Sequence, residues 1–295
     1  MLTTGGAGPY TLPMSRPLAP VVDFYNRHPI SEGQIIDALR RQGKDLKWLA
    51  PEDLYDLDQD HYGGLEAVAA LGRRAGIDAS SEVLDVCAGL AGPGRFMARR
   101  WGARVTGVDL HADRAAGARR LTAAVGLGGL VRMVRADAQV LPFRAHAFTA
   151  VVRQEGLLHV PDKAATLAEC RRVLLPGGRI AFSDWIARAR LGDGERRRLD
   201  EWMAAVTLQS IPSYKALLAG AGFVAIGAED LSREWMAILR KRLEMFRGLR
   251  ADTVARLGQA RYDEYDQLYA FFVGLVETGK LGGARFSATA GPGAF

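Results

Sequence analysis

Two aspartates, Asp85 and Asp109, each close a short apolar run. A turn of small residues, Cys87 to Ala91, follows the first, and such a turn lets backbone N–H groups and the start of a helix approach a ligand closely. The second carboxylate ends the next apolar run, where it can accept hydrogen bonds from both hydroxyls of a ribose. The pattern predicts a strand–helix–strand unit that holds a nucleotide-like cofactor. The alternative for Asp109 is the N-cap of the following helix.

The details of this turn separate two classes of cofactor. A dinucleotide site requires Gly-x-Gly-x-x-Gly after its first strand, whereas Cys87, Gly89 and Gly92 occupy the nearest positions here. A carboxylate at Asp85 would repel a pyrophosphate, but it could face a cationic amino-acid group. This charge argument favours S-adenosylmethionine over NAD, and a nicotinamide-dependent oxidoreductase stays the alternative enzyme class.

The elements that must position these residues follow from the alternation of apolar runs and helical segments. This alternation predicts crossover connections and therefore a doubly wound, mostly parallel α/β sheet covered on both faces. Expected helices include 31–41 with Ser31 as N-cap, 65–75, 193–208 and 212–220. Two long helices over 232–278 are interpreted as an insertion before the last strand, with a separate helical domain as the alternative. The expected strands are 83–86, 105–108, 131–134, 147–152, 179–183, 223–228 and 281–288.

The stretch from Val83 to Asp184 resembles the class I S-adenosylmethionine-dependent methyltransferases. The shared features, in chain order, are Asp85, Cys87, Gly89 and Ala91 in the first motif, Asp109, Asp137-Ala138, and Leu174 to Gly178. The family has three glycines in the first motif, and Cys87 and Ala91 replace two of them.

This resemblance implies a Rossmann-like fold with a seven-stranded sheet, S-adenosylmethionine as methyl donor and S-adenosylhomocysteine as product. By the same resemblance Asp137 accepts a hydrogen bond from the adenine amino group and Ala138 supplies a backbone N–H; a helix cap is the alternative for Asp137. The expected cofactor-binding residues are Tyr62, Asp85, Cys87, Ala88, Gly89, Asp109, Leu110, Arg114, Asp137, Ala138 and Gln154. No metal ligand is expected, because His28, Asp60 and His61 lack the spacing of a metal site.

The methyl acceptor should meet the donor beyond the carboxyl ends of the strands, where Gln154 to His159 follow the fourth strand. His159 could act as a general base and Glu155 could attract a cationic amine. The alternative for His159 is a structural histidine that caps the helix starting at Pro161. Asp184 and Trp185, which follow the fifth strand, could bind a polar acceptor and exclude water, or simply form a strand-end turn.

The N-terminal segment resembles the lid that such methyltransferases fold over the cofactor, which excludes water from the reacting sulfonium. Tyr25 belongs to this segment and completes the expected catalytic set with His159 and Glu155. The expected organisation is a disordered tail over 1–22, a helical lid over 23–78, and a methyltransferase core over 79–295 with a helical insertion at 232–280.

Several short stretches point to one branch of the family. His61 to Gly64, His159 to Pro161 and the closing 279–286 resemble bacterial sarcosine/dimethylglycine-type N-methyltransferases. This resemblance favours an amine nitrogen of a small molecule as acceptor. O- or C-methylation of a small aromatic, quinone or isoprenoid is the alternative, and a noncatalytic cofactor-binding or scaffold protein is the alternative class. Thr149 and Arg153 depart from the family pattern in the fourth strand.

The composition is that of a globular protein: 295 residues, 48% hydrophobic, 24% charged, and a net charge of +6. The densest basic cluster, Arg196 to Arg198, is expected to be a solvated helix face rather than a nucleic-acid site. With only two cysteines, the sequence does not predict a disulfide framework. It also contains no run of about 18 apolar residues, so no membrane span is expected. These features favour a cytoplasmic location, and a homodimer is compatible with them. Aromatic residues at near-helical spacing over 262–272 are expected to form a core or interface stripe rather than a binding site.

Overall fold

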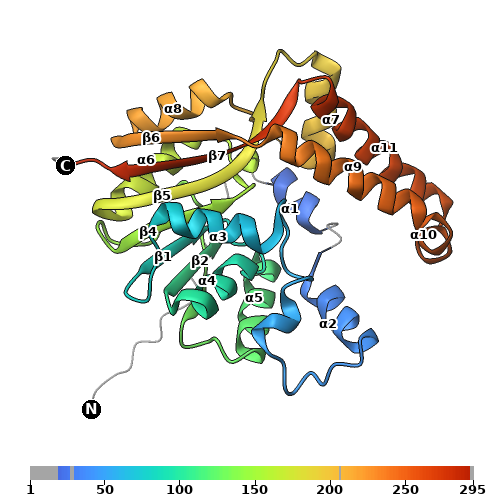
Figure 1. Ribbon diagram of the computed structural model, residues 1–295, viewed down its shortest axis with the longest axis horizontal. Coiled ribbons are helices and arrows are strands. Elements are labelled where there is room, and N and C mark those ends of the chain that lie inside the picture. The colour runs from blue at the N-terminus through green and yellow to red at the C-terminus, as the bar shows by residue number, and fades with distance from the viewer. Residues whose placement is uncertain (1–18, 27–29, 206, 293–295) are drawn as a thin grey trace.

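The fold is organised around one seven-stranded sheet, seen in the computed structural model of Figure 1, which describes residues 19–26, 30–205 and 207–292. The strand order is β3-β2-β1-β4-β5-β7-β6, and only the two pairings of β7 are antiparallel. This confirms the predicted doubly wound, mostly parallel sheet. The strands are β1 (Glu82–Val86), β2 (Arg104–Asp109), β3 (Val131–Arg135), β4 (Phe148–Gln154), β5 (Leu174–Ala187), β6 (Phe223–Asp230) and β7 (Leu281–Ala290).

Helices cover both faces of the sheet, and the inner strands β1, β2 and β4 accordingly bury side chains on both sides. Apolar residues of α3, α4 and α5 pack with one face, and those of α6 and α8 pack with the other. The bounds of these helices are α3 (Gly64–Ala75), α4 (Gly92–Trp101), α5 (Ala112–Ala124), α6 (Lys163–Val173) and α8 (Ile211–Gly220), and a 3-10 turn, η3 (Leu157–His159), precedes α6. Two cores thus hold the sheet rigid and leave its strand ends exposed to ligands.

The register of the parallel strands brings the predicted cofactor residues to one edge. Asp85 lies beside Gly107 of β2 and Val152 of β4, and Asp109 lies beside Arg135 of β3. The turns that follow β1, β2, β3 and β4 therefore meet at the same end of the sheet. This is the edge at which ligands bind in open α/β folds.

The N-terminal segment contributes α1 (Ala19–Asn26), α2 (Glu32–Arg41) and the 3-10 turn η2 (Pro51–Leu54). Ser31 caps α2 as predicted, since its side chain accepts a hydrogen bond from the Gln34 N–H. The expected disordered tail over 1–22 ends too late, because α1 already begins at Ala19. Residues 1–18 of that tail lie outside the described residues.

The helical insertion stands between β6 and β7 and contains three helices where the sequence predicted two: α9 (Ser232–Gly248), α10 (Arg250–Leu257) and α11 (Gln259–Glu277). The break before α11 falls at Gly258, whose positive φ of 84° ends α10. Figure 1 shows this arm extending away from the sheet. Because β7 returns between β5 and β6, the arm is an insertion in the sheet rather than a separate domain.

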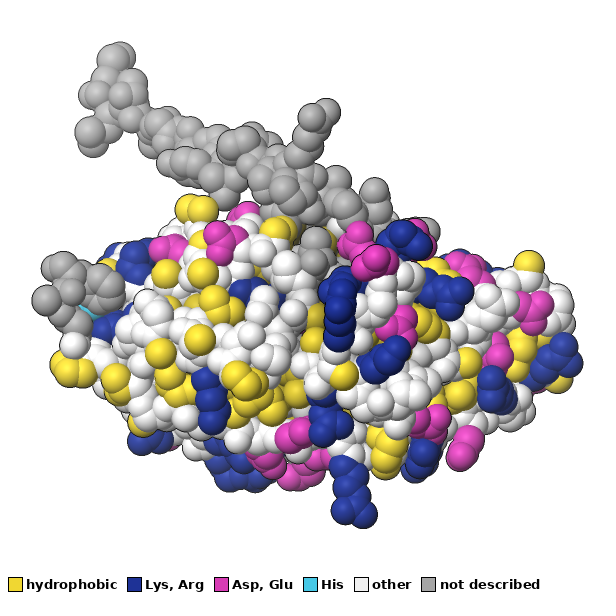
Figure 2. Space-filling view, turned by 90° about the horizontal axis from the view of Figure 1, so that it is seen from above, with side chains coloured by type: hydrophobic (Ala, Val, Ile, Leu, Met, Phe, Trp, Pro, Cys, Tyr) yellow, Lys and Arg dark blue, Asp and Glu magenta, His cyan; other side chains and the backbone are white. Residues whose placement is uncertain are grey.

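The base of the arm packs against α7 (Asp193–Met203) and the end of β5 in a third apolar cluster. α7 is shorter than the expected 193–208, because Ala204 adopts a left-handed conformation and ends it. No described helix is both long and apolar enough to cross a bilayer. On the face drawn in Figure 2, basic and acidic side chains of the described residues are interspersed with apolar ones.

Candidate active site

The turn after β1 keeps a glycine-like backbone although two of its positions are not glycine. Cys87, Gly89 and Ala91 all have positive φ, between 54° and 60°. A left-handed conformation costs a residue with a Cβ about 1–2 kcal/mol, so the fold sustains strain at Cys87 and Ala91 to preserve the turn. A Cβ on Gly89 would lie 2.7 Å from the Arg114 Nη2 atom, so a side chain there would require the end of Arg114 to shift.

Asp109 fastens this turn to the end of β2. Its Oδ2 accepts a hydrogen bond from the Gly89 N–H (2.8 Å) and its Oδ1 accepts one from the His111 N–H (2.9 Å). The N-cap of α5 is His111, so the capping alternative for Asp109 does not hold. Each carboxylate oxygen has a second lone pair, which leaves acceptor capacity for ribose hydroxyls.

Asp137 closes a turn rather than capping a helix. It accepts hydrogen bonds from the backbone N–H and the side-chain amide of Gln139. The segment between β3 and β4 contains turns and no helix, so the capping alternative fails here too. Both Asp137 and Ala138 line the cavity into which the turn after β1 opens.

This cofactor cavity brings together the predicted residues from four strand ends and the lid. Two buried oxygens of its lining, Asp85 Oδ2 and Gln154 Oε1, have no hydrogen-bond partner among the described residues. Burial raises the pKa of Asp85 to about 7, which the nearby Arg153 opposes. Of the predicted site residues, Tyr62 alone is absent from the lining, which contains Tyr25, Asp85, Cys87, Ala88, Gly89, Asp109, Leu110, Arg114, Asp137, Ala138, Gln154, Glu155 and His159.

Arg114 ties the lid to the cofactor cavity. Its guanidinium pairs with Asp60 (2.9 Å), donates to the Ile30 carbonyl (3.2 Å) and lies 4.6 Å from the centre of the Tyr25 ring. The His111 ring contacts Asn26 Oδ1 at 2.9 Å, which adds a link between α5 and α1. Arg114 of α5 therefore contacts two parts of the N-terminal segment, at Tyr25 and Asp60, and both of these residues line the cavity.

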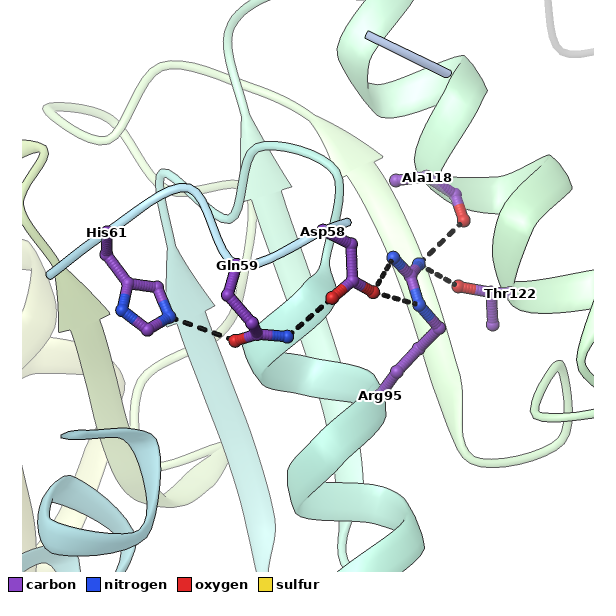
Figure 3. Close-up of polar contacts among 6 residues, drawn as sticks. All are labelled: Asp58, Gln59, His61, Arg95, Ala118 and Thr122. Carbon is purple, nitrogen blue, oxygen red and sulfur yellow. Dashed lines mark hydrogen bonds and ion pairs between the residues drawn. The ribbon is translucent and has the colours of Figure 1, made fainter. Parts of the chain in front are cut away.

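A buried ion pair anchors the loop between η2 and α3 (Figure 3). Arg95 donates to Asp58 Oδ2 through Nη2 (2.8 Å) and Nε (3.3 Å), and the two side chains are 1% and 0% exposed. Burial raises the pKa of Asp58, while Arg95 stabilises its negative charge. A Cβ on Gly92 would lie 2.2 Å from the Asp58 carbonyl oxygen, so this loop crosses the start of α4 in direct contact.

Tyr25 and His159 form a hydrogen-bonded pair at the mouth of the cofactor cavity. The His159 Nδ1–H donates to the Ala204 carbonyl (3.0 Å), so Nε2 carries the lone pair and accepts from the Tyr25 hydroxyl (2.9 Å). Burial lowers the pKa of His159 to about 4 and raises that of Tyr25, so both are neutral near pH 7. The N-cap of α6 is Asp162, so His159 does not cap that helix.

Glu155 follows β4 in a left-handed conformation, with φ of 48°. Its Oε1 accepts a hydrogen bond from the Tyr62 N–H at 2.7 Å, which links the strand end to the lid. Burial raises the pKa of Glu155 to about 8. Its side chain is therefore mainly neutral at pH 7 and carries little negative charge to attract an amine.

Comparisons with known proteins agree with this geometry. Residues 84–182 match a methyltransferase domain. The chain is 30% identical over 223 residues to methyltransferase GfsG of Streptomyces halstedii, which covers 69% of this chain and 80% of that protein. The chain belongs to the S-adenosylmethionine-dependent methyltransferases. Its methyl donor is S-adenosylmethionine, as the resemblance predicted.

Other relatives of the methyltransferase act on chemically different acceptors. It is 30% identical over 189 residues to the 27-O-demethylrifamycin SV methyltransferase of Amycolatopsis mediterranei, which covers 63% of this chain and 69% of that protein. It spans only about 40% of the plant phosphoethanolamine N-methyltransferases that also match. Its fold resembles a phosphoethanolamine N-methyltransferase of Haemonchus contortus with a TM-score of 0.73 at 20% identity, over 91% of this chain and 59% of that one.

A second cavity of about 470 Å³ adjoins the cofactor cavity, and Tyr25, Glu155 and His159 line both. We call it the acceptor cavity. Part of the stripe over 262–272 is in a core as expected, since Phe272 belongs to the third apolar cluster and Tyr269 packs against it, but Tyr265, Tyr269 and Phe272 also line this cavity. The aromatic lining residues are Tyr25, Tyr62, Trp185, Trp202, Tyr265, Tyr269 and Phe272.

Tyr62 joins the lid to the wall of the acceptor cavity instead of lining the cofactor cavity. Its ring packs against Trp185 and Trp235, and the Arg242 guanidinium lies 4.5 Å from the ring centre. Trp185 is thus part of the wall, in line with the predicted exclusion of water. No pattern in the sequence pointed to Arg242, which comes from α9 in the arm.

Asp184 lies away from both cavities. It is fully buried and accepts hydrogen bonds from the Tyr214 hydroxyl and the Leu158 N–H, so it belongs to the packing of α8 and η3 on β5. Arg153, the departure noted in β4, is buried, and its three guanidinium nitrogens have no hydrogen-bond partner among the described residues, although its charge acts on Asp85 and Asp184. A Cβ on Gly156 would lie 2.5 Å from Arg153 Nη2. Among the residues described, no group of three His, Cys, Asp or Glu side chains could hold a metal.

Proposed function

We propose that this methyltransferase transfers a methyl group to a hydroxyl of a bulky, largely apolar small molecule. The observation that carries this proposal is the acceptor cavity, which has an aromatic wall and meets the cofactor cavity at Tyr25 and His159. Pockets of about 300–1,000 Å³ hold molecules of drug size. A cavity of about 470 Å³ would leave a small amino acid loosely held, with few contacts to orient it.

An amine acceptor, which the sequence favoured, depends on negative charge near the reacting nitrogen. The two carboxylates considered for this role, Glu155 and Asp184, supply little negative charge to the cavity. Glu155 has a pKa raised to about 8 by burial, and Asp184 lines neither cavity because its carboxylate is buried against Tyr214 and the Leu158 N–H. The remaining acidic residues of the cavity, Asp60 and Glu264, are paired with Arg114 and Arg261, and Glu201 lies on α7. A neutral hydroxyl needs no such charge.

The cofactor residues fit the donor. Asp85 and Gln154 offer buried acceptor oxygens to a cationic amino-acid portion, Asp109 offers acceptors to a ribose, and Asp137 lies near enough to line the same cavity. S-adenosylmethionine supplies a methyl carbon on a positively charged sulfur. The segment that covers the cavity, held by Arg114, excludes water from that carbon.

Tyr25 and His159 supply the route for the proton that an acceptor hydroxyl must lose. As the new O–C bond forms and the S–C bond breaks, the Tyr25 oxygen takes the hydroxyl proton and passes its own proton to His159 Nε2. The resulting imidazolium keeps its Nδ1–H on the Ala204 carbonyl. The methyl group ends on oxygen, the positive charge ends on His159, and the donor leaves as S-adenosylhomocysteine.

The experiment is a screen with S-adenosylmethionine labelled in its methyl group, over hydroxylated polycycles and macrocycles, small amines and isoprenoids. Label should appear on oxygen in bulky hydroxylated molecules. Exclusive labelling of a small amine, or of carbon, would refute the hydroxyl proposal. Binding of S-adenosylmethionine with no transfer to any acceptor would favour the noncatalytic alternative.

The proton route has its own variant test. Tyr25→Phe keeps the ring contact with Arg114 but removes the hydroxyl, so kcat should fall about 10²–10⁴-fold while the Kd for S-adenosylmethionine stays within about twofold. Tyr55→Phe, at a tyrosine that packs on Phe96 outside both cavities, is the matched control and should leave kcat unchanged. An unaltered kcat in Tyr25→Phe would exclude Tyr25 from proton transfer.

A further inference from the structure

Four side chains form a hydrogen-bonded chain from the buried ion pair to the cofactor cavity, and its first part is drawn in Figure 3. Asp58 Oδ1 contacts Gln59 Nε2 (2.6 Å), and Gln59 Oε1 contacts His61 Nε2 (2.9 Å). On the other side of the ring, His61 Nδ1 contacts Gln154 Nε2 at 3.1 Å. Gln154 lies 93 positions along the chain from His61, at the end of β4.

The ion pair fixes the direction of every hydrogen bond in this chain. A carboxylate paired with Arg95 can only accept, so the Gln59 amide presents its NH₂ group to Asp58 and its oxygen to His61. The oxygen requires a donor, which places the imidazole proton on Nε2. A neutral imidazole then has a lone pair on Nδ1, and Gln154 must turn its NH₂ group toward it.

The consequence is that the Gln154 amide oxygen points away from the chain. This Oε1 atom is buried and has no hydrogen-bond partner among the described residues, and Gln154 lines the cofactor cavity. The competing contact is the Tyr62 carbonyl, 3.3 Å from His61 Nδ1, which would bind that nitrogen only if it carried a proton. Removing the chain would free the amide to turn over and present its NH₂ group to the cavity instead.

We propose that His61 is a positioning residue for the methyl donor, because it holds the Gln154 amide with its oxygen toward the cationic methionine portion of S-adenosylmethionine. A carbonyl oxygen stabilises a nearby positive charge, whereas an NH₂ group repels it. The inference rests on the methyl donor of the proposed function but not on its acceptor. His61 itself lines both cavities, so its action through Gln154 must be distinguished from a direct contact with the ligand, which the double variant below does.

The test measures donor binding by calorimetry, without turnover, in His61→Asn, Gln154→Met and the double variant. An asparagine is too short to bridge Gln59 and Gln154, and methionine keeps the length of glutamine without its amide. Each single variant should weaken S-adenosylmethionine about tenfold or more, as expected for a hydrogen bond to a charged group. His146→Asn, at an exposed histidine with positive φ, is the matched control and should bind like the wild type.

The double variant separates positioning from a general loosening of the loop. If His61 acts through Gln154, His61→Asn should add less than a twofold loss in the Gln154→Met background. Losses that multiply, or single variants within twofold of wild type, would overturn the proposal. S-adenosylhomocysteine lacks the sulfonium charge but keeps the ammonium group. A loss confined to S-adenosylmethionine would place Gln154 beside the sulfonium, and an equal loss for both ligands would place it beside the ammonium.

A failed acceptor screen with intact binding of S-adenosylmethionine would refute the hydroxyl proposal and leave this inference standing. Absence of donor binding in the wild-type protein would refute both.

Discussion

The Asp58→Asn variant tests how much the buried ion pair of Asp58 and Arg95 contributes to the free energy of unfolding. Arg95 donates two N–H groups to Oδ2, and the Gln59 amide donates to Oδ1. Asparagine has one oxygen, so its NH₂ group must face either Arg95 or the Gln59 donor. Arg95 also becomes a buried charge without its counterion, since the remaining contacts are with Ala118 O and Thr122 Oγ1. Removing one partner of a buried pair costs about 3–5 kcal/mol.

Thermal denaturation of the unliganded protein measures this cost. At about 2–4 °C per kcal/mol for a chain of this size, Tm should fall by about 6–20 °C. The control is Glu52→Gln, which breaks the exposed pair with Arg99, whose side chains are 57% and 49% exposed for Arg99 and Glu52. An exposed pair contributes about 0–1 kcal/mol, so this variant should shift Tm by less than about 4 °C.

A double variant distinguishes two causes of the lost stability: the loss of attraction between the two charges, and the burial of one charge without its partner. Asp58→Leu combined with Arg95→Met replaces both charges by apolar groups and should recover most of the stability, because buried pairs are often no better than apolar packing. A Tm for Asp58→Asn within about 2 °C of wild type would refute the reasoning. So would a double variant less stable than Asp58→Asn, since the cost would then come from lost packing.

Three further predictions concern pH and donor affinity. With a pKa near 4, His159 is neutral above about pH 5, so kcat should stay level from pH 7 to 5 and fall below pH 5. A decline of kcat centred near pH 6.5 would instead show a solvated histidine. Glu155 gains its charge as pH rises through about 8, so titration calorimetry should show tighter binding of cationic S-adenosylmethionine above pH 8 in the wild type but not in Glu155→Gln. Asp109→Ala should raise the Kd for S-adenosylmethionine about 10- to 100-fold, because a charged partner of the ribose and of the Gly89 N–H is lost; an unchanged Kd would remove Asp109 from the site.

The sheet and the cofactor turn could be predicted from the sequence because their signals are local. Apolar runs of strand length, small residues after β1 and the carboxylates near the ends of β1 and β2 all lie within short stretches, and parallel pairing brings those ends together. The expected tail over 1–22 overlaps the first four residues of α1, since the proline- and glycine-rich stretch resembles a tail and Ala19 begins the helix within it.

The acceptor side was harder to predict because it depends on contacts between distant segments. Tyr265 and Tyr269 have the spacing of any buried helix face, and only the placement of α7 and α1 leaves a cavity in front of them. His61 resembles a weak metal ligand in the sequence, yet it connects Gln59 to Gln154, which follows 93 positions later. Asp184 closes a promising strand end, but its side chain turns into the core toward Tyr214.

Because of the arm between β6 and β7, the donor and acceptor cavities are lined in part by different stretches of the chain. The donor is held by one early stretch of the chain, whereas much of the aromatic wall comes from α7 and from an excursion that leaves the sheet and returns to it. Strand pairing fixes both ends of this excursion, and Arg242 of α9 connects it to the donor side by donating to the His61 carbonyl and lying over the Tyr62 ring. Tyr265 and Tyr269 of α11 line the acceptor cavity but not the cofactor cavity, so substitutions there change the acceptor wall without replacing a residue that surrounds the donor.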